Sequence, residues 1–232
     1  MLESVILCGG LGTRLRARVS GRPKALAIVQ GRPFLSYQLD WLAENGHFDV
    51  TLATGYLGNQ IEEFARDLRD SRFSLTVVSE AQPLGTGGAI VNAVTTKGAK
   101  DDLFLVLNGD TLLDFDTAPL LRQHKETGAK VTLVVGEVED ISRFGTVDIV
   151  ANRIVGFEQP SGMHKPGVVS AGAFVLAREQ IMALPKGVYS IERDCFPRMA
   201  AEGRMCAYRL PEDNSFFDIG TSEAFDLINR KN

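Results

Sequence analysis

The sequence predicts an α/β fold with a Rossmann-like, mostly parallel central sheet, helices on both faces and a small antiparallel lobe. Three observations lead to this prediction. In the first half of the chain, short apolar runs alternate with segments of helical periodicity, as in parallel sheets whose crossover connections are helices. Several of these runs end in glycine-rich or Asn-Gly turns. In the second half, strand signals follow one another across short loops, which favours antiparallel pairing.

The alternating order of the first half can be followed along the chain. Strand-like runs cover residues 4–8, 50–53, 73–78, 103–107 and 130–135, and helical segments between them cover 33–45, 60–68, 87–94 and 119–127. The first helix has Pro33 in its first turn and Gly46 just after its end. Proline suits a helix start and glycine a helix stop, so these bounds are consistent with the periodicity.

The second half changes character after residue 135. Strand signals lie at 146–149, 154–157 and 171–176, and a last helix is predicted at 221–229. We interpret these strands as antiparallel additions to the sheet or as a small lobe. The length of 232 residues suits one domain. We therefore expect a single domain over 1–232, with one half at about 1–135 and the other at about 136–232.

Composition excludes several classes of protein. Apolar residues make up 44% and charged residues 23%, as in ordinary globular chains, and the net charge of −4 argues against a general nucleic-acid binder. The three cysteines show no CxxC spacing and the three histidines no metal-ligand spacing. Residues 1–8 lack the features of a signal peptide, and no apolar stretch approaches the length of a membrane span. We expect a cytoplasmic protein without a membrane partner.

Three loops follow predicted strands and should meet at one edge of the sheet, because ligands bind at the carboxyl ends of such strands. They cover 9–15, 83–88 and 108–110. The first reads Gly-Gly-Leu-Gly-Thr-Arg-Leu, and its glycines allow backbone N–H groups to approach a polyphosphate, while Arg14 and Lys24 add positive charge. It is not a P-loop, since no Gly-Lys-Ser/Thr follows. It is not the dinucleotide fingerprint, since Leu15 replaces the third glycine.

Two aspartates suggest a metal site. Asp110 ends a buried strand, where a carboxylate can hold Mg²⁺ against phosphate oxygens. Asn-Gly-Asp alone is more often only a turn. Asp218 follows two phenylalanines and precedes Ile-Gly-Thr, a buried setting in which an unpaired carboxylate is costly. A shared metal ion would satisfy both groups.

Taken together, these motifs resemble the signature of the sugar-phosphate nucleotidyltransferases. The resemblance covers essentially the whole chain in order, through Gly-Gly-Leu-Gly-Thr-Arg-Leu at 9–15, Pro-Lys at 23–24, Glu80, Pro-Leu-Gly-Thr-Gly-Gly at 83–88, Asn-Gly-Asp at 108–110, Arg-Phe-Gly at 143–145, Ser-Ala-Gly at 170–172, Ile-Glu at 191–192 and Phe-Asp-Ile-Gly-Thr at 217–221. It implies a magnesium-dependent enzyme that joins a nucleoside triphosphate to a sugar 1-phosphate and releases pyrophosphate. It also implies that the antiparallel lobe binds the sugar.

The resemblance assigns roles to individual positions. The catalytic residues would be Arg14, Lys24 and Asp110, and Mg²⁺ would be held by Asp110 and Asp218. The nucleotide would be bound by Leu7, Gly9, Gly10, Gly12, Thr13, Glu80, Pro83, Gly85, Thr86, Asn108 and Gly109. Gly145, Gly172 and Glu192 would face the sugar phosphate.

One position departs from the family pattern. The family often has Glu-Lys-Pro where this chain has Glu158-Gln159-Pro160, and that lysine binds the sugar phosphate. Gln159 cannot supply the charge, although it stays among the residues expected near the sugar phosphate. Lys165, six residues later, and Arg143 are the candidates to replace it.

Glu80 favours GTP as the nucleotide, because guanine offers two adjacent donors on its Watson–Crick edge and a carboxylate accepts both. The segments Pro-Lys-Ala-Leu at 23–26 and Gly-Thr-Gly-Gly-Ala at 85–89 most resemble the D-glycero-D-manno-heptose 1-phosphate guanylyltransferases, which supply GDP-heptose for bacterial surface polysaccharide. The competing interpretation is a uridylyltransferase acting on N-acetylmuramate 1-phosphate or on a hexose 1-phosphate.

Other classes stay open at this point. They are a non-catalytic nucleotide-sugar sensor, a cytidylyltransferase acting on a non-sugar alcohol phosphate, and a glycosyltransferase whose Asp-x-Asp metal motif would be Asp114-Phe115-Asp116. The oligomeric state also stays open, with a homodimer as one option.

Overall fold

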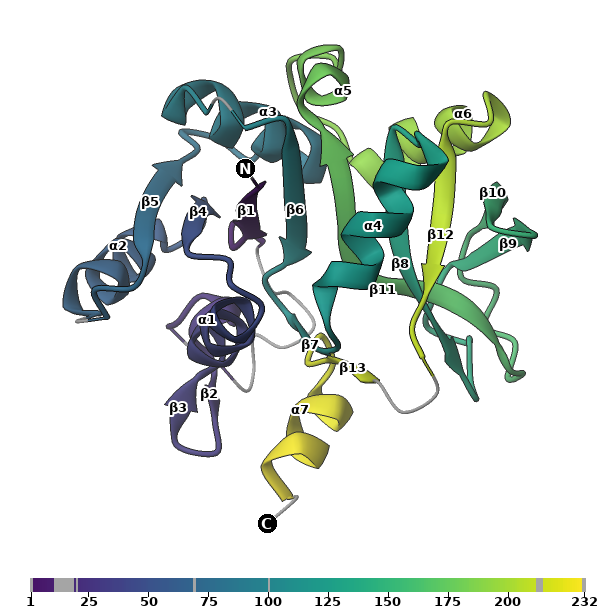
Figure 1. Cartoon of the computed structure of the whole chain (residues 1–232). Helices are drawn as coiled ribbons and strands as arrows, with labels where there is room; N and C mark the ends of the chain where they lie inside the picture. The colour runs from purple at the N-terminus through teal and green to yellow at the C-terminus, as the bar shows by residue number, and fades with distance from the viewer. Residues whose placement is uncertain are drawn as a thin grey trace.

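A nine-stranded sheet forms the centre of the molecule in the computed structural model, which describes residues 2–10, 19, 21–68, 70–99, 101–211 and 215–230 (Figure 1). Its strands are β1 (Leu2–Leu7), β4 (Asp49–Thr54), β5 (Ser74–Ser79), β6 (Leu103–Asn108), β8 (Val131–Val138), β9 (Thr146–Val150), β10 (Arg153–Glu158), β11 (Gly167–Ala177) and β12 (Met205–Arg209). Their order across the sheet is β5-β4-β1-β6-β11-β8-β12-β10-β9.

Helices cover both faces of the sheet, as the sequence predicts. They are α1 (Phe34–Glu44), α2 (Gly58–Asp67), α3 (Gly85–Lys97), α4 (Thr117–Thr127), α5 (Arg178–Met182), α6 (Phe196–Ala201) and α7 (Ser222–Arg230), with a 3-10 turn at Lys24–Leu26 and a π-helical turn at Ile191–Cys195. One apolar core lies under α3, α5 and α6, and a second lies under α1, α2 and α4. In the described part of the chain, no helix is both long and apolar enough to cross a membrane.

The first strands form the parallel part of the sheet. β1 pairs in parallel with β4 and β6, and β4 pairs in parallel with β5. Buried side chains such as Val5, Leu52 and Phe104 explain why these strands are nearly continuous apolar runs, since both faces are covered. The carboxyl ends of β1, β4, β5 and β6 therefore meet at one edge, which confirms this part of the prediction.

The expectation of a mostly parallel sheet is wrong for the sheet as a whole, which is mixed. The long strand β11 lies between β6 and β8 and runs antiparallel to both, and β10 is antiparallel to β12 and β9. Apolar patterning predicts a strand but not its direction, because direction is set by long-range pairing. The predicted antiparallel strands are present as β9 and β10, and they continue the main sheet.

A short ladder brings the end of the chain to the edge where β6 ends. Strand β13 (Ser215–Asp218) pairs antiparallel with β7 (Thr111–Asp114), so that Asp218 lies opposite Thr111. Ile219, the next residue, is fully buried and its N–H donates to the carbonyl of Asp110 at 2.9 Å. Helix α7 then lies beside the β2–β3 hairpin (Ile28–Val29 and Arg32–Pro33), where the side-chain amide of Gln30 donates to the carbonyl of Ile228 (Figure 1).

Candidate active site

Backbone hydrogen bonds fix the loops that follow the parallel strands. The Cys8 N–H after β1 donates to Ala53 O at 2.7 Å, and the Gly109 N–H after β6 donates to Leu7 O at 3.1 Å. Glu80, just after β5, donates its N–H to Thr54 O at 2.8 Å. The ends of four neighbouring strands are therefore held in one layer.

These strand ends enclose a cavity of about 310 Å³. It is lined by Leu7, Cys8, Gly9, Gly10, Lys24, Ala25, Glu80, Pro83, Gly85, Thr86, Ala89, Asn108, Gly109 and Asp110. All described residues that the sequence assigned to nucleotide binding are in this set. The remaining three assigned to the nucleotide or to catalysis, Gly12, Thr13 and Arg14, lie outside the described residues.

A cluster of charges stands at one side of this cavity. The Lys24 ammonium group forms an ion pair with Asp110, and the two side chains are only 17% and 32% exposed. Asp218 lies near the same group, since a Cβ added to Gly220 would come within 2.6 Å of Asp218 Oδ1 and 3.0 Å of Lys24 Nζ, and the charge of Lys24 lowers the pKa of Asp218. We call Lys24, Asp110 and Asp218 the charged centre.

The electrostatics of the charged centre suit a divalent cation. Burial raises the pKa of Asp218, and the nearby negative charge of Asp110 raises it further, while Lys24 lowers it. Although Lys24 and Arg143 lower this pKa, burial and Asp110 raise it overall, so an added cation would stabilise the ionised carboxylates. Carboxylate oxygens are the ligands that Mg²⁺ prefers, so Asp110 and Asp218 are the residues here that could hold it.

A second acidic group lies at the opposite edge of the sheet. Carboxylate oxygens of Glu3, Asp49 and Asp101 lie within 4.8 Å of one another near the amino ends of β1, β4 and β6. Lys97 Nζ is 3.1 Å from Glu3 and 2.5 Å from Asp49, so this group has its own counter-charge. Its position separates it from the cavity.

Glu80 projects into the cavity from the end of β5. Its Oε2 accepts a hydrogen bond from the Leu84 N–H at 3.0 Å. Burial raises the pKa of Glu80, and this hydrogen bond partly opposes that rise. A Cβ added to Gly55 would lie 2.3 Å from Oε1, and one added to Gly9 would lie 3.0 Å from it. Glycine at both strand ends therefore makes room for this carboxylate.

Two of the residues expected at the sugar phosphate adjoin the cavity. The Thr86 hydroxyl donates to Glu192 Oε2 at 2.6 Å. Gly172 has φ +73°, and a Cβ there would lie 2.6 Å from Thr111 Oγ1 and 3.3 Å from Asn108 Nδ2. Glu192 is thus hydrogen-bonded to the first turn of α3, and Gly172 lies close to Asn108, the last residue of β6.

The other three expected sugar residues are less closely connected. Gly145 starts the β9–β10 hairpin, and a Cβ there would lie 2.7 Å from the carbonyl oxygen of Glu158. Gln159 and Lys165 lie in the exposed loop after β10. Within the described residues, no hydrogen bond or ion pair joins either side chain to the charged centre.

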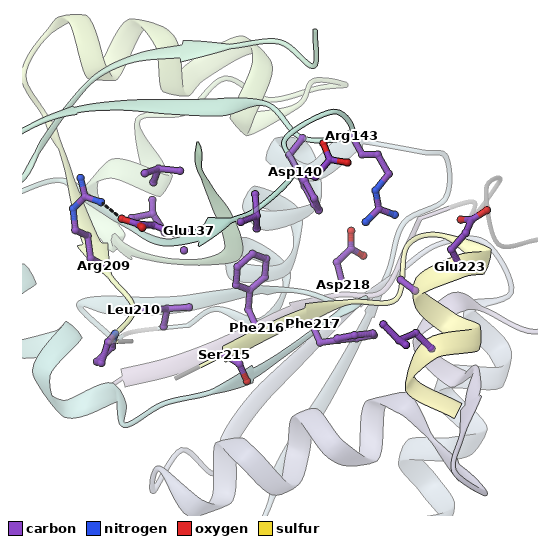
Figure 2. A pocket seen from close by; sticks show the side chains of 18 residues that line it. Glu137, Asp140, Arg143, Arg209, Leu210, Ser215, Phe216, Phe217, Asp218 and Glu223 are labelled. Atoms are coloured by element: carbon purple, nitrogen blue, oxygen red, sulfur yellow. Dashed lines mark hydrogen bonds and ion pairs between the residues drawn. The ribbon is translucent and has the colours of Figure 1, made fainter. Parts of the chain in front are cut away.

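A larger groove of about 1120 Å³ begins at Asp218 and runs along the ends of β8 and β13 beside α7. Figure 2 shows Asp140, Arg143, Asp218 and Glu223 gathered at one end and the Glu137–Arg209 pair at the other. Arg143 Nη1 donates to Thr221 Oγ1 at 2.8 Å, and its charge lowers the pKa of Asp218. Of the two candidates to replace the family lysine, Arg143 and Lys165, Arg143 is therefore the one that interacts with the charged centre.

The geometry agrees with the comparisons with known proteins. Residues 3–231 match the family model described as nucleotidyl transferase. The chain belongs to the nucleotidyl transferase family.

Among relatives, the mannose-1-phosphate guanylyltransferase of Mycobacterium tuberculosis is 34% identical over 97% of this chain. The chain spans only 62% of that relative's length. The D-glycero-alpha-D-manno-heptose 1-phosphate guanylyltransferase of Aneurinibacillus thermoaerophilus is 31% identical over 97% of this chain and 95% of the relative. The crystal structure of HddC from Yersinia pseudotuberculosis complexed with GMP-PN superposes with a TM-score of 0.87, 28% identity and coverage of 100% and 99% of the two chains.

Sequence reasoning missed several residues of the candidate site. Cys8 lines the cavity and is buried, and burial together with the charge of Asp110 raises the pKa of its thiol to about 12, so the thiol stays neutral. Gly55 and Gly220 make room for Glu80 and for the charged centre. The available signal was their position, since Gly55 lies two residues after the predicted strand at 50–53 and Gly220 lies two residues after Asp218.

Proposed function

We propose that this chain is a guanylyltransferase that joins GTP to a sugar 1-phosphate, with D-glycero-D-manno-heptose 1-phosphate as the first choice, and releases pyrophosphate. The observation that carries the proposal is the charged centre at the side of a cavity lined by two glycine-rich loops and Glu80. The segments Pro-Lys-Ala-Leu at 23–26 and Gly-Thr-Gly-Gly-Ala at 85–89 favour the heptose, and two heptose 1-phosphate guanylyltransferases are 31% identical to this chain. Because GTP is made in the cytoplasm, the reaction belongs there.

The chemistry asks the protein mainly for positioning and positive charge. The acceptor phosphate is already an anion at neutral pH, so its attack on the α-phosphorus needs no general base. The barriers are repulsion between two anions and the charge that develops on the leaving pyrophosphate. In the proposed mechanism an acceptor oxygen attacks in line, the bond to pyrophosphate breaks, and Lys24 neutralises the phosphate oxygens during transfer.

Other groups complete the proposed mechanism. Mg²⁺ bound at Asp110 and Asp218 would supply charge neutralisation at the phosphate oxygens. Gly9 and Gly10 line the cavity, and their backbone N–H groups would donate to phosphate. Arg14 is assigned to the leaving pyrophosphate.

A substrate matrix tests the function. GTP, UTP, CTP and dTTP are each combined with heptose, mannose, glucose and N-acetylmuramate 1-phosphates plus Mg²⁺, and pyrophosphate release is measured. The expected signal is confined to GTP and strongest with the heptose. Strongest release with mannose 1-phosphate would favour the second candidate, which the 34% identical relative supports. Release with UTP alone would overturn the nucleotide assignment, and no release in any pair would overturn the function.

Glu80→Gln is expected to raise the KM for GTP roughly tenfold, because the amide offers one acceptor where the carboxylate offers two to the guanine edge. The pH dependence follows from the raised pKa of Glu80. Only the ionised form accepts both donors, so the wild-type KM for GTP should rise as pH falls, beginning above the usual range of a glutamate. In the variant this dependence disappears.

Glu62→Gln is the matched control for Glu80→Gln. Glu62 is an exposed carboxylate on α2 that accepts a hydrogen bond from Ser79, one residue before Glu80. The KM of the Glu62→Gln variant for GTP should stay within about twofold of the wild-type value, as for most surface substitutions. An unchanged KM and pH profile in Glu80→Gln would contradict the assignment of Glu80 to the base.

Arg143 is proposed to supply the cation that Gln159 lacks. Arg143→Ala should raise the KM for the sugar 1-phosphate roughly tenfold and leave that for GTP unchanged, because a charge-assisted contact to phosphate is lost. Lys165→Ala should change neither. Steady-state kinetics with each substrate varied in turn measure both effects. A raised KM for the sugar 1-phosphate in Lys165→Ala, with an unchanged KM in Arg143→Ala, would assign the contact to Lys165.

A further inference from the structure

The segment at residues 187–192, which we call the strap, lies on the glycine-rich loop at the start of α3. The Tyr189 N–H donates to Leu84 O at 3.0 Å, and the Gly87 N–H donates to Tyr189 O at 3.1 Å. Ile191, near the end of the strap, is fully buried in the core under α3. The strap is thus fixed to the nucleotide cavity by its backbone.

The glycines of this loop are required by the strap. A Cβ added to Gly85 would lie 2.4 Å from Tyr189 O, and one added to Gly87 would lie 2.0 Å from the ring atom Tyr189 Cε2. At Gly88 a Cβ would lie 2.1 Å from Gly187 O. Heavy atoms that are not bonded do not approach so closely, so glycine at these positions permits contact between the two protein segments.

Thr86 is the one residue with a side chain between Gly85 and Gly88, and both hydrogen-bonding functions of its hydroxyl are used on the strap. Its oxygen accepts the Ile191 N–H at 3.0 Å. Its hydrogen is donated to Glu192 Oε2 at 2.6 Å. The Ser190 hydroxyl donates to the same oxygen at 3.1 Å.

These contacts orient the Glu192 carboxylate. Two hydroxyls hold Oε2, while Oε1 has no hydrogen-bond partner within the described residues. Glu192 is the second residue of a π-helical turn at Ile191–Cys195, a rare geometry that is often found at functional sites. The carboxylate is half-buried and offers one open acceptor next to a residue that lines the nucleotide cavity.

We propose that Thr86 is a positioning residue for the acceptor, which holds Glu192 so that Oε1 receives a hydroxyl group of the sugar 1-phosphate. The strap thereby links the loop that lines the nucleotide cavity to the acceptor contact. This inference rests on the proposed function, in which Glu192 faces the sugar. According to this inference, Thr86 acts on the acceptor, through Glu192. Its position in the cavity wall, taken alone, would instead suggest that Thr86 binds the nucleotide.

Thr86→Val and Thr86→Ser test the inference. Valine keeps the shape and removes the hydroxyl, so the KM for the acceptor should rise roughly tenfold, as expected for losing a hydrogen bond to a charged group. The dissociation constant for GTP, measured without acceptor, should stay within about twofold. Serine should restore the acceptor KM. Thr96→Val is the matched control, since Thr96 lies exposed on the same helix and its hydroxyl donates to Asn92 Oδ1 at 3.2 Å.

Combining Thr86→Val with Glu192→Gln distinguishes a positioning role of Thr86 from a merely structural one. Thr86→Val should add little to the acceptor KM of Glu192→Gln, because both act on one contact. Ser190→Ala, which removes only the second hydroxyl, should raise the acceptor KM about threefold even if Thr86→Val fails to fold.

The outcomes separate this inference from the proposed function. Weaker GTP binding with an unchanged acceptor KM in Thr86→Val would make Thr86 a nucleotide ligand and overturn the inference alone. Full additivity with Glu192→Gln would also overturn it. Absence of pyrophosphate release by the wild-type protein with every sugar 1-phosphate would overturn the proposed function together with the inference.

Discussion

Asp110→Asn is expected to lower turnover by roughly two to three decades at saturating GTP and acceptor, the loss typical of removing one group that stabilises developing charge. Asparagine keeps the size of the side chain and removes the charge that pairs with Lys24 and that repels Asp218. With one carboxylate left, the centre should also need more Mg²⁺ for half-maximal activity. Pyrophosphate release measured across a Mg²⁺ titration gives both quantities.

Asp116→Asn is the matched control for Asp110→Asn. Asp116 caps α4 by accepting the Ala118 N–H at 2.9 Å, and asparagine caps helices about as well. Turnover and Mg²⁺ dependence should therefore stay within about twofold. Asp116 is the second aspartate of the Asp-x-Asp motif that a glycosyltransferase would use to bind a metal, and here its side chain caps a helix. Wild-type turnover by folded Asp110→Asn would remove Asp110 from the charged centre.

Local sequence signals were sufficient for the parallel part of the sheet and for the cavity beneath it. The apolar runs that became β1, β4 and β6 are buried on both faces, so their composition alone marks them as strands. Gly9 and Asp110 lie within three residues of the ends of two of these runs. Strand direction then brings them to one edge without any information from the rest of the chain.

Features that depend on distant pairing could not be predicted in the same way. The direction of β11 is set by β6 and β8, and its own apolar pattern is compatible with either direction. Strand β13 is short and half-buried, and only its pairing with β7 brings Asp218 to the charged centre. Thr86 and Glu192 are 106 residues apart, and the strap that joins them has no periodic pattern.

Lys24→Met is expected to lower turnover by a similar two to three decades, but with the opposite effect on the metal. The transferred phosphate loses the ammonium group that is proposed to neutralise its oxygens, so the transition state is destabilised. At the same time Asp110 loses the ammonium group that occupies its oxygen, and the half-saturating Mg²⁺ concentration should fall. Both variants should turn over more slowly, but the half-saturating Mg²⁺ concentration should fall in Lys24→Met and rise in Asp110→Asn.

The pH profile of Lys24→Met gives an independent check of the same geometry. Lys24 lowers the pKa of Asp218, whereas burial and Asp110 raise it, so removing the lysine should raise this pKa further. Metal binding needs the ionised carboxylate, so the loss of activity on acidification should begin at a higher pH in the variant than in the wild type. Lys165→Met, on the exposed loop after β10, should leave turnover, metal dependence and pH profile unchanged. An acid limb that stays in place in Lys24→Met would show that Lys24 and Asp218 do not interact, and would separate the lysine from the proposed metal site.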